Sequence, residues 1–136
     1  MFSLIMVLGL AATASYESYP SETVDQFIVR NARSIEAIGI RENAEVCGAI
    51  ILDGDRYRLT VSTKKSNIQC TVEHSEEDIL IHTHLPYMGM RFSPADYSHP
   101  GYMIRNGVIC YNSGERGTEV TITKYGRRNG GMCEAQ

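Results

Sequence analysis

Apolar residues recur at helical spacing within residues 20–39, on a face made by Val24, Phe27, Ile28, Ile35 and Ile38. A period near 3.6 predicts an amphipathic helix that buries this face. Residues 23–26 (TVDQ) have the form of a capping box, which satisfies free N–H groups at a helix start. Gly39 suits the end of the helix, because glycine readily adopts the left-handed conformation found there. We therefore expect one long N-terminal helix over residues 20–39.

Strand patterns dominate the rest of the chain. Residues 46–52 (VCGAIIL) form a nearly continuous apolar run, and residues 56–63 (RYRLTVST) alternate between polar and apolar. Both patterns are typical of strands, and the Asp-Gly-Asp sequence between them suits a hairpin turn. Further strands are expected at residues 68–72, 78–84, 107–112 and 119–125.

A second helix start lies at residues 93–96 (SPAD). Serine is a favoured N-cap, proline a favoured first helical residue, and an acidic side chain is stabilised near the positive end of the helix dipole. Because Pro100 and Gly101 follow closely, this helix should be short. The elements together predict an α/β (α+β) domain: one mixed sheet, a long N-terminal helix, and a short helix after the strand that ends in histidines.

The first 14 residues (MFSLIMVLGLAATA) contain no charged side chain and are mostly apolar. This run is shorter than the roughly 20 residues that cross a bilayer, so we expect no stable membrane span. It has the form of a signal peptide over residues 1–14, with cleavage after the small-x-small sequence ATA. Residues 15–136 would then form a single domain of a secreted or periplasmic protein. The alternatives are a buried N-terminal strand or an incorrectly chosen start codon, and the protein would then be cytoplasmic.

Charge and cysteine content narrow the function classes. A net charge of −3 offers no basic excess for a phosphate backbone, which argues against nucleic-acid binding. The four cysteines, Cys47, Cys70, Cys110 and Cys133, include no C-x-x-C pair and so lack the spacing of a four-cysteine zinc site. In an oxidising compartment an even number predicts disulfide bonds, with three pairings open. In the cytosol the same residues would be buried thiols.

Residues 82–96 (HTHLPYMGMRFSPAD) concentrate the residue types that bind metals. His82 and His84 point to the same face of a strand, and Asp96 adds a carboxylate at the next helix start. Three protein ligands leave the fourth position of a tetrahedral zinc ion open for water, as in catalytic sites. Glu45, at the start of a buried strand, is the candidate general base, and the Ser93 hydroxyl is the candidate oxyanion stabiliser.

These residues match a known family. Glu45, the HTH sequence and the SPAD sequence resemble, in order and spacing, the motif of the JAMM/MPN+ zinc metallopeptidases. Residues 45–50 (EVCGAI) also resemble the Glu-x-x-Gly entry to a central strand in that family. The resemblance covers roughly residues 44–112. The chain is similar to small bacterial JAMM-like domains, some of which are fused to Rhs-type secreted toxins.

The resemblance implies a JAMM/MPN-like, cytidine-deaminase-like layered sheet. It also implies one zinc ion per chain bound by His82, His84 and Asp96, with Glu45 as general acid/base and Ser93 stabilising the oxyanion. The implied substrate is a protein or peptide that is cleaved at a peptide or isopeptide bond. A second hypothesis is a non-enzymatic, disulfide-stapled secreted binding module, or a toxin-associated domain, on a JAMM-like scaffold.

Overall fold

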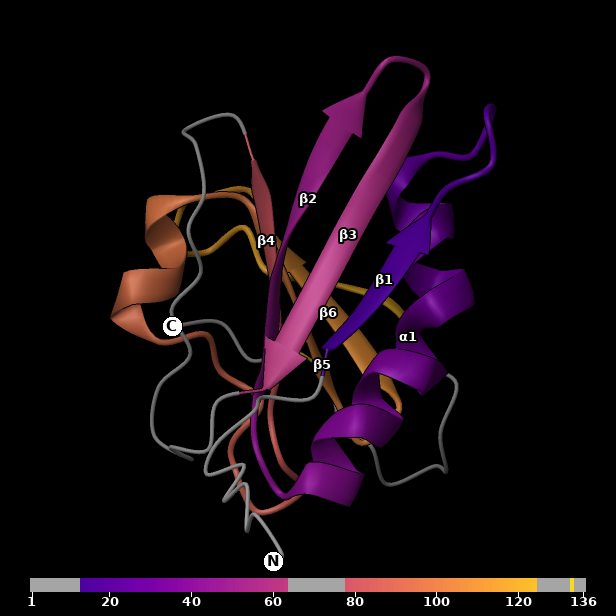
Figure 1. The fold of residues 1–136 in the computed structure, drawn as a ribbon. Helices are drawn as coiled ribbons and strands as arrows, with labels where there is room; N and C mark the ends of the chain where they lie inside the picture. Colours follow the sequence, from indigo (N-terminus) through magenta and orange to yellow (C-terminus); the bar gives the residue numbers. More distant parts are fainter. Residues whose placement is uncertain (1–12, 64–77, 125–132, 134–136) are drawn as a thin grey trace, which may run out of the picture.

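A computed structural model describes residues 13–63, 78–124 and 133 (Figure 1). Its elements, in chain order, are β1 (Thr13–Glu17), α1 (Val24–Glu42), β2 (Val46–Asp53), β3 (Arg56–Thr63), β4 (Ile79–Thr83), the 3₁₀ helix η1 (Pro94–Ser98), β5 (Gly101–Arg105), β6 (Val108–Asn112) and β7 (Val120–Lys124). The seven strands form one sheet in the order β1-β3-β2-β4-β5-β6-β7. The β4–β5 pair is parallel and the other neighbouring pairs are antiparallel. The expected α+β class with one mixed sheet is therefore confirmed.

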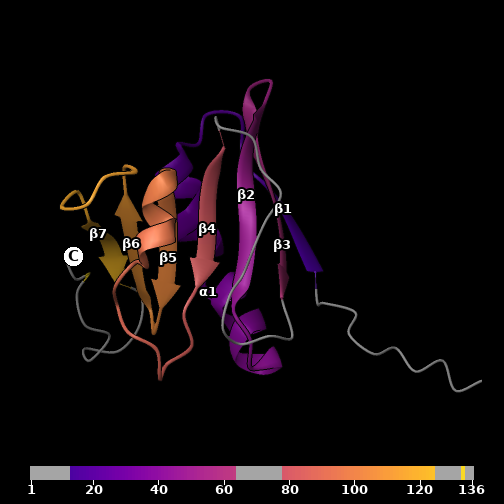
Figure 2. The same ribbon diagram turned by 90° about the vertical axis from the view of Figure 1, so that its left-hand side faces the viewer.

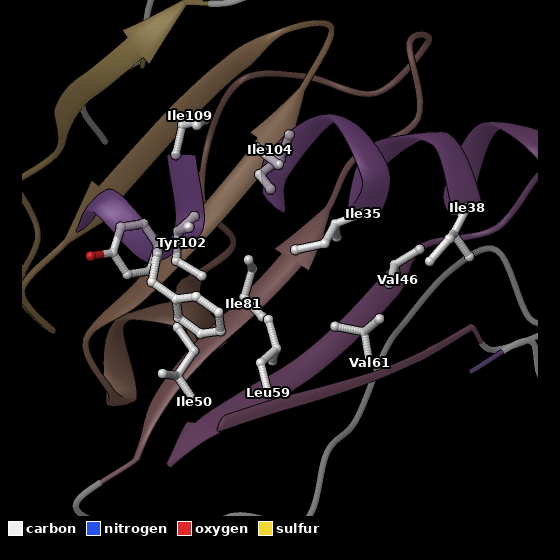
Figure 3. Close-up of a cluster of buried hydrophobic side chains, with 13 residues drawn as sticks. Ile35, Ile38, Val46, Ile50, Leu59, Val61, Ile81, Tyr102, Ile104 and Ile109 are labelled. Atoms are coloured by element: carbon white, nitrogen blue, oxygen red, sulfur yellow. The ribbon is translucent and has the colours of Figure 1, made fainter. Parts of the chain in front are cut away.

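The sheet separates two layers. In Figure 2, η1 lies in front of the sheet and α1 lies behind it. The main core fills the space between α1 and the sheet, where Figure 3 shows side chains of both meeting. It includes Phe27, Ile28, Ile35, Val46, Leu59, Val61, Ile81, Tyr102, Ile104 and Ile109. A smaller apolar cluster covers the opposite face and consists of Met90, Phe92, Met103, Val108 and Cys110. Both faces of the central strands are therefore covered.

The capping box at the start of α1 agrees with the sequence, but the helix begins at Val24 and not at residue 20, and its end also differs from the expected one. Thr23 is the N-cap and exchanges both capping-box hydrogen bonds with Gln26. The helix continues past Gly39 to Glu42 and ends at Asn43, whose φ of 49° is left-handed. The prediction of Gly39 as the stop is wrong. A Cβ at this glycine would lie 2.9 Å from the Ala44 carbonyl oxygen and 3.1 Å from Thr83 Oγ1 on β4, so the position serves close packing of the helix on the turn that follows it and on the sheet.

The strands β1 and β5 were not predicted, and the second helix is the 3₁₀ helix η1. Residues 100–101 do not interrupt a helix, because Gly101 begins β5. Strand β5 returns to β6 through Asn106 and Gly107, whose φ values of 50° and 80° suit a tight hairpin turn. Glu36 on α1 accepts hydrogen bonds from both of their backbone N–H groups. The strand expected at residues 68–72 lies outside the described residues.

The N-terminal strand β1 overlaps the end of the expected signal peptide. Thr13 and Ala14 pair with Ser62 and Val61 of β3, while residues 1–12 lie outside the described residues. The signal peptide over residues 1–14 therefore stays a prediction. Within the described residues, no helix combines the length and apolar character needed to cross a lipid bilayer.

The disulfide prediction is confirmed for one specific pair. Cys110 on β6 is bonded to Cys133, with 5.7 Å between their Cα atoms. Cys47 on β2 is also disulfide-bonded. The described cysteines are therefore not the free thiols that a reducing cytosol would favour.

Candidate metal centre

Strand register brings the predicted site residues onto the sheet face opposite α1. On β4, His82 lies opposite Cys47 of β2 and beside Met103 of β5. Side chains two residues apart on a strand share a face, so the same registers, continued by two residues, place Glu45 opposite His84. The polar residues thus gather where β2 begins and β4 ends.

The ring nitrogens and carboxylates meet at short distances. His82 Nε2 lies 3.2 Å from His84 Nε2 and 3.7 Å from Asp96 Oδ2. His84 Nε2 lies 3.9 Å from Glu45 Oε1. The Glu45 side chain is 7% exposed and that of Asp96 26%, so the cluster is largely enclosed but reachable from one side. The structure therefore brings together four of the five predicted site residues.

The 3₁₀ helix η1 positions Asp96. The Ser93 N–H donates to Asp96 Oδ2 at 2.6 Å, and the Asp96 N–H donates to the Ser93 carbonyl oxygen at 2.9 Å. Pro94 follows the N-cap and restricts the backbone there. Ser93 is thus joined to the cluster through its backbone. Its side chain is exposed, and no hydrogen bond from its hydroxyl to the two histidines or to Glu45 is seen in the described part of the chain.

Burial sets the protonation states of the cluster. It raises the pKa of Glu45 to about 7, and the nearby Asp96 charge contributes in the same direction. Burial also lowers the pKa of His82 and of His84, more than the neighbouring Asp96 raises them. Both imidazoles are therefore neutral near pH 7, the form in which histidine binds a metal ion.

The donor set and its spacing fit a zinc ion in part. Neighbouring ligands at a tetrahedral zinc ion with N and O donors are about 3.3 Å apart. The distances from His82 Nε2 to His84 Nε2 and to Asp96 Oδ2, 3.2 Å and 3.7 Å, are close to that value. Across residues 13–63, 78–124 and 133, no group of three or more His, Cys, Asp or Glu side chains already stands in full metal-binding geometry. The three residues suit zinc in donor type, and the two distances from His82 are close to those between ligands of a tetrahedral zinc ion.

Two contacts of His84 were not foreseen. Its Nδ1 lies 2.7 Å from the Gly89 carbonyl oxygen, and the same register places Arg105 of β5 beside it on the side away from Glu45. The Asn-Gly pair after Arg105 is a strong hairpin signal and could have located β5 in the sequence. Its parallel pairing with β4 has no comparable local signal.

Comparisons of the chain with known protein families, with curated proteins and with solved structures find no match.

Proposed function

We propose that the chain is a zinc-dependent hydrolase of amide bonds, acting on a peptide or isopeptide bond of a protein or peptide substrate. The observation that supports this best is the convergence of two neutral imidazoles and two carboxylates from β2, β4 and η1. His82, His84 and Asp96 would bind one zinc ion. The resemblance of the same residues to the JAMM/MPN+ motif in the sequence points in the same direction.

Glu45 is suited to move the proton in this reaction. When bound, zinc supplies a Lewis acid that polarises a carbonyl group and makes water more acidic. Glu45, with a pKa of about 7, can accept a proton from the attacking water near neutral pH and return it to the leaving nitrogen. The new C–O bond thus replaces the broken C–N bond without net proton change at Glu45. The Ser93 hydroxyl would stabilise the oxyanion.

Metal content tests the binding half of the proposal. Protein purified without a His-tag or added metal should hold close to one zinc ion per chain by elemental analysis. Asp96→Asn should lose most of it, because the amide is a poor zinc ligand although it can still accept from the Ser93 N–H. Asp55→Asn, at the exposed β2–β3 turn, is the matched control and should keep its zinc. Wild-type protein that takes up no zinc on titration would refute the proposal.

Turnover tests the catalytic half. Glu45→Gln should keep zinc but lose roughly 10²–10⁴ in rate on peptide and isopeptide libraries, the range for removing a general base. Glu17→Gln on β1 changes an exposed carboxylate and should leave the rate unchanged. Ser93→Ala should cost on the order of 10²–10³ in rate if the hydroxyl serves the oxyanion. Full turnover by Glu45→Gln would contradict the mechanism.

The Cys110–Cys133 disulfide supports a second part of the proposal, that the chain works outside the reducing cytosol, as a secreted or periplasmic protein. The same bond also favours the alternative of a disulfide-stapled binding module without catalysis. The two functions separate cleanly in the assays above. A binding module would keep its fold and show no zinc-dependent turnover.

A further inference from the structure

Arg105 stands next to the candidate metal centre but belongs to none of the roles assigned so far. It ends β5, and its Nη2 donates to the carbonyl oxygen of Pro86 at 2.6 Å. Its Nε is buried, and no hydrogen-bond partner for this nitrogen is found among the described residues. A guanidinium in this position has little freedom, because one end is enclosed and the other is bonded to backbone.

The carbonyl that Arg105 binds lies within a tight turn that begins at Leu85 and leads back to His84. The Met88 N–H donates to the Leu85 carbonyl oxygen at 2.9 Å, and the Gly89 carbonyl then faces His84 Nδ1 at 2.7 Å. A carbonyl oxygen can only accept, so Nδ1 must carry the proton. The lone pair of His84 is then on Nε2, the atom that faces His82.

Among the described residues, the exposed part of this turn has few other hydrogen bonds to the rest of the protein. Leu85 and Met90 are buried at 2% and 5% exposure and fix its two ends. Between them, Pro86, Tyr87 and Gly89 are exposed. The carbonyl of Pro86 is held by Arg105, and that of Gly89 is held by His84.

We propose that Arg105 is a positioning residue for His84. By holding the Pro86 carbonyl, it keeps the 85–89 turn in the conformation in which Gly89 fixes the ring orientation and the Nδ1–H tautomer of His84. The role of this tautomer in zinc binding rests on the proposed function, whereas the control of the tautomer by Arg105 does not. Outer partners of metal-binding histidines commonly change metal affinity about 10- to 100-fold when removed.

Two substitutions test the hydrogen bond. Arg105→Met removes every donor but keeps an extended side chain, whereas Arg105→Lys keeps an N–H donor on a side chain nearly as long as that of arginine. Histidine ring ¹⁵N NMR of the metal-free protein in EDTA reports the tautomer directly. We expect Nδ1–H in the wild type and in Arg105→Lys, and a mixture with Nε2–H in Arg105→Met. Arg58→Ala, at an exposed ion pair on β3, should leave the tautomer unchanged.

Zinc titration gives the second readout, with a dissociation constant about tenfold higher for Arg105→Met than for the wild type. An Nε2–H tautomer in the wild type would overturn the proposal. So would an unchanged tautomer in Arg105→Met, or equal disruption in both variants, which would show that a donor at this position is not what fixes the turn. If Arg105→Met does not fold, Arg105→Ala replaces it: a mixed tautomer supports the proposal and an unchanged tautomer overturns it. Absence of zinc binding by the wild type would remove the proposed function but leave the tautomer result intact.

Discussion

Replacing Glu45 by Gln should change how the stability of the metal-free protein depends on pH. Burial raises the pKa of this carboxyl from 4.5 to about 7 in the folded chain. The Glu45 carboxyl therefore loses its proton at a higher pH in the folded state than in the unfolded chain. Below pH 4.5 both states hold the proton and the burial carries no charge penalty. As pH rises from 4.5 through 7, the wild type loses stability, and above that range the loss is complete.

The size of the effect follows from the shift. A change from 4.5 to about 7 is equivalent to about 3 kcal/mol at 1.36 kcal/mol per pKa unit. Because the carboxylate is reachable by solvent from one side, screening reduces this to roughly 1–3 kcal/mol. Glu45→Gln cannot ionise, so it should become more stable relative to the wild type by this amount between pH 4.5 and pH 8.

Urea unfolding in EDTA, with the disulfides intact, measures this difference directly. The free energy of unfolding is determined at several pH values for the wild type, Glu45→Gln and the exposed control Glu17→Gln. Subtracting the wild-type curve removes the contributions of the two buried histidines, which both proteins share. Parallel curves for the wild type and Glu45→Gln would refute the raised pKa and, with it, the suitability of Glu45 as a base near pH 7.

Three further predictions concern the frame around the site. Glu36→Ala removes the acceptor of two backbone N–H groups in the β5–β6 turn. It should lower the free energy of unfolding, measured by urea titration, by roughly 2–4 kcal/mol. An unchanged value would mean that water replaces the carboxylate without a loss of stability. Replacing Cys110 and Cys133 together by Ala opens a link across 23 residues and should lower the unfolding free energy by about 3 kcal/mol, measured against the oxidised wild type. Gly39→Ala should lower the melting temperature, because its Cβ would lie 2.9 Å from a backbone oxygen. The resulting strain of about 1–3 kcal/mol exceeds the gain in helix propensity. A raised melting temperature would show that the helix can shift to make room.

Local patterns in the sequence predicted those features that depend on neighbouring residues. The capping box of Thr23 and Gln26 marked the helix start, because both partners lie within four residues. The apolar run of β2 and the alternation of β3 also read directly as strands. Gly39 was misread, because glycine at a helix end and glycine at a close contact look the same in sequence. The contacts that require it come from Ala44, in the turn after the helix, and from Thr83, on β4.

The candidate site likewise combines residues that local sequence patterns predict with one residue that they do not. The His-x-His spacing and the SPAD sequence predicted that His82, His84 and Asp96 would lie near one another, and the structure places His82 Nε2 close to the other two. Arg105 could not be found in this way. Its place beside His84 depends on the parallel pairing of β4 with β5, which no local pattern encodes.

The parallel pair β4–β5 has a consequence for how the site is assembled. Because parallel neighbours need a crossing connection, residues 84–100 must pass over one face of the sheet, and η1 lies on that connection. The three proposed metal ligands therefore belong to one short, contiguous piece of chain, residues 82–96. Glu45, directly before β2, comes more than 30 residues earlier. In the proposed function, metal binding and proton transfer therefore depend on two separate segments of the chain. A variant that loses Glu45 would keep its metal ligands, and changes in the loop between the ligands would leave the proposed base in place.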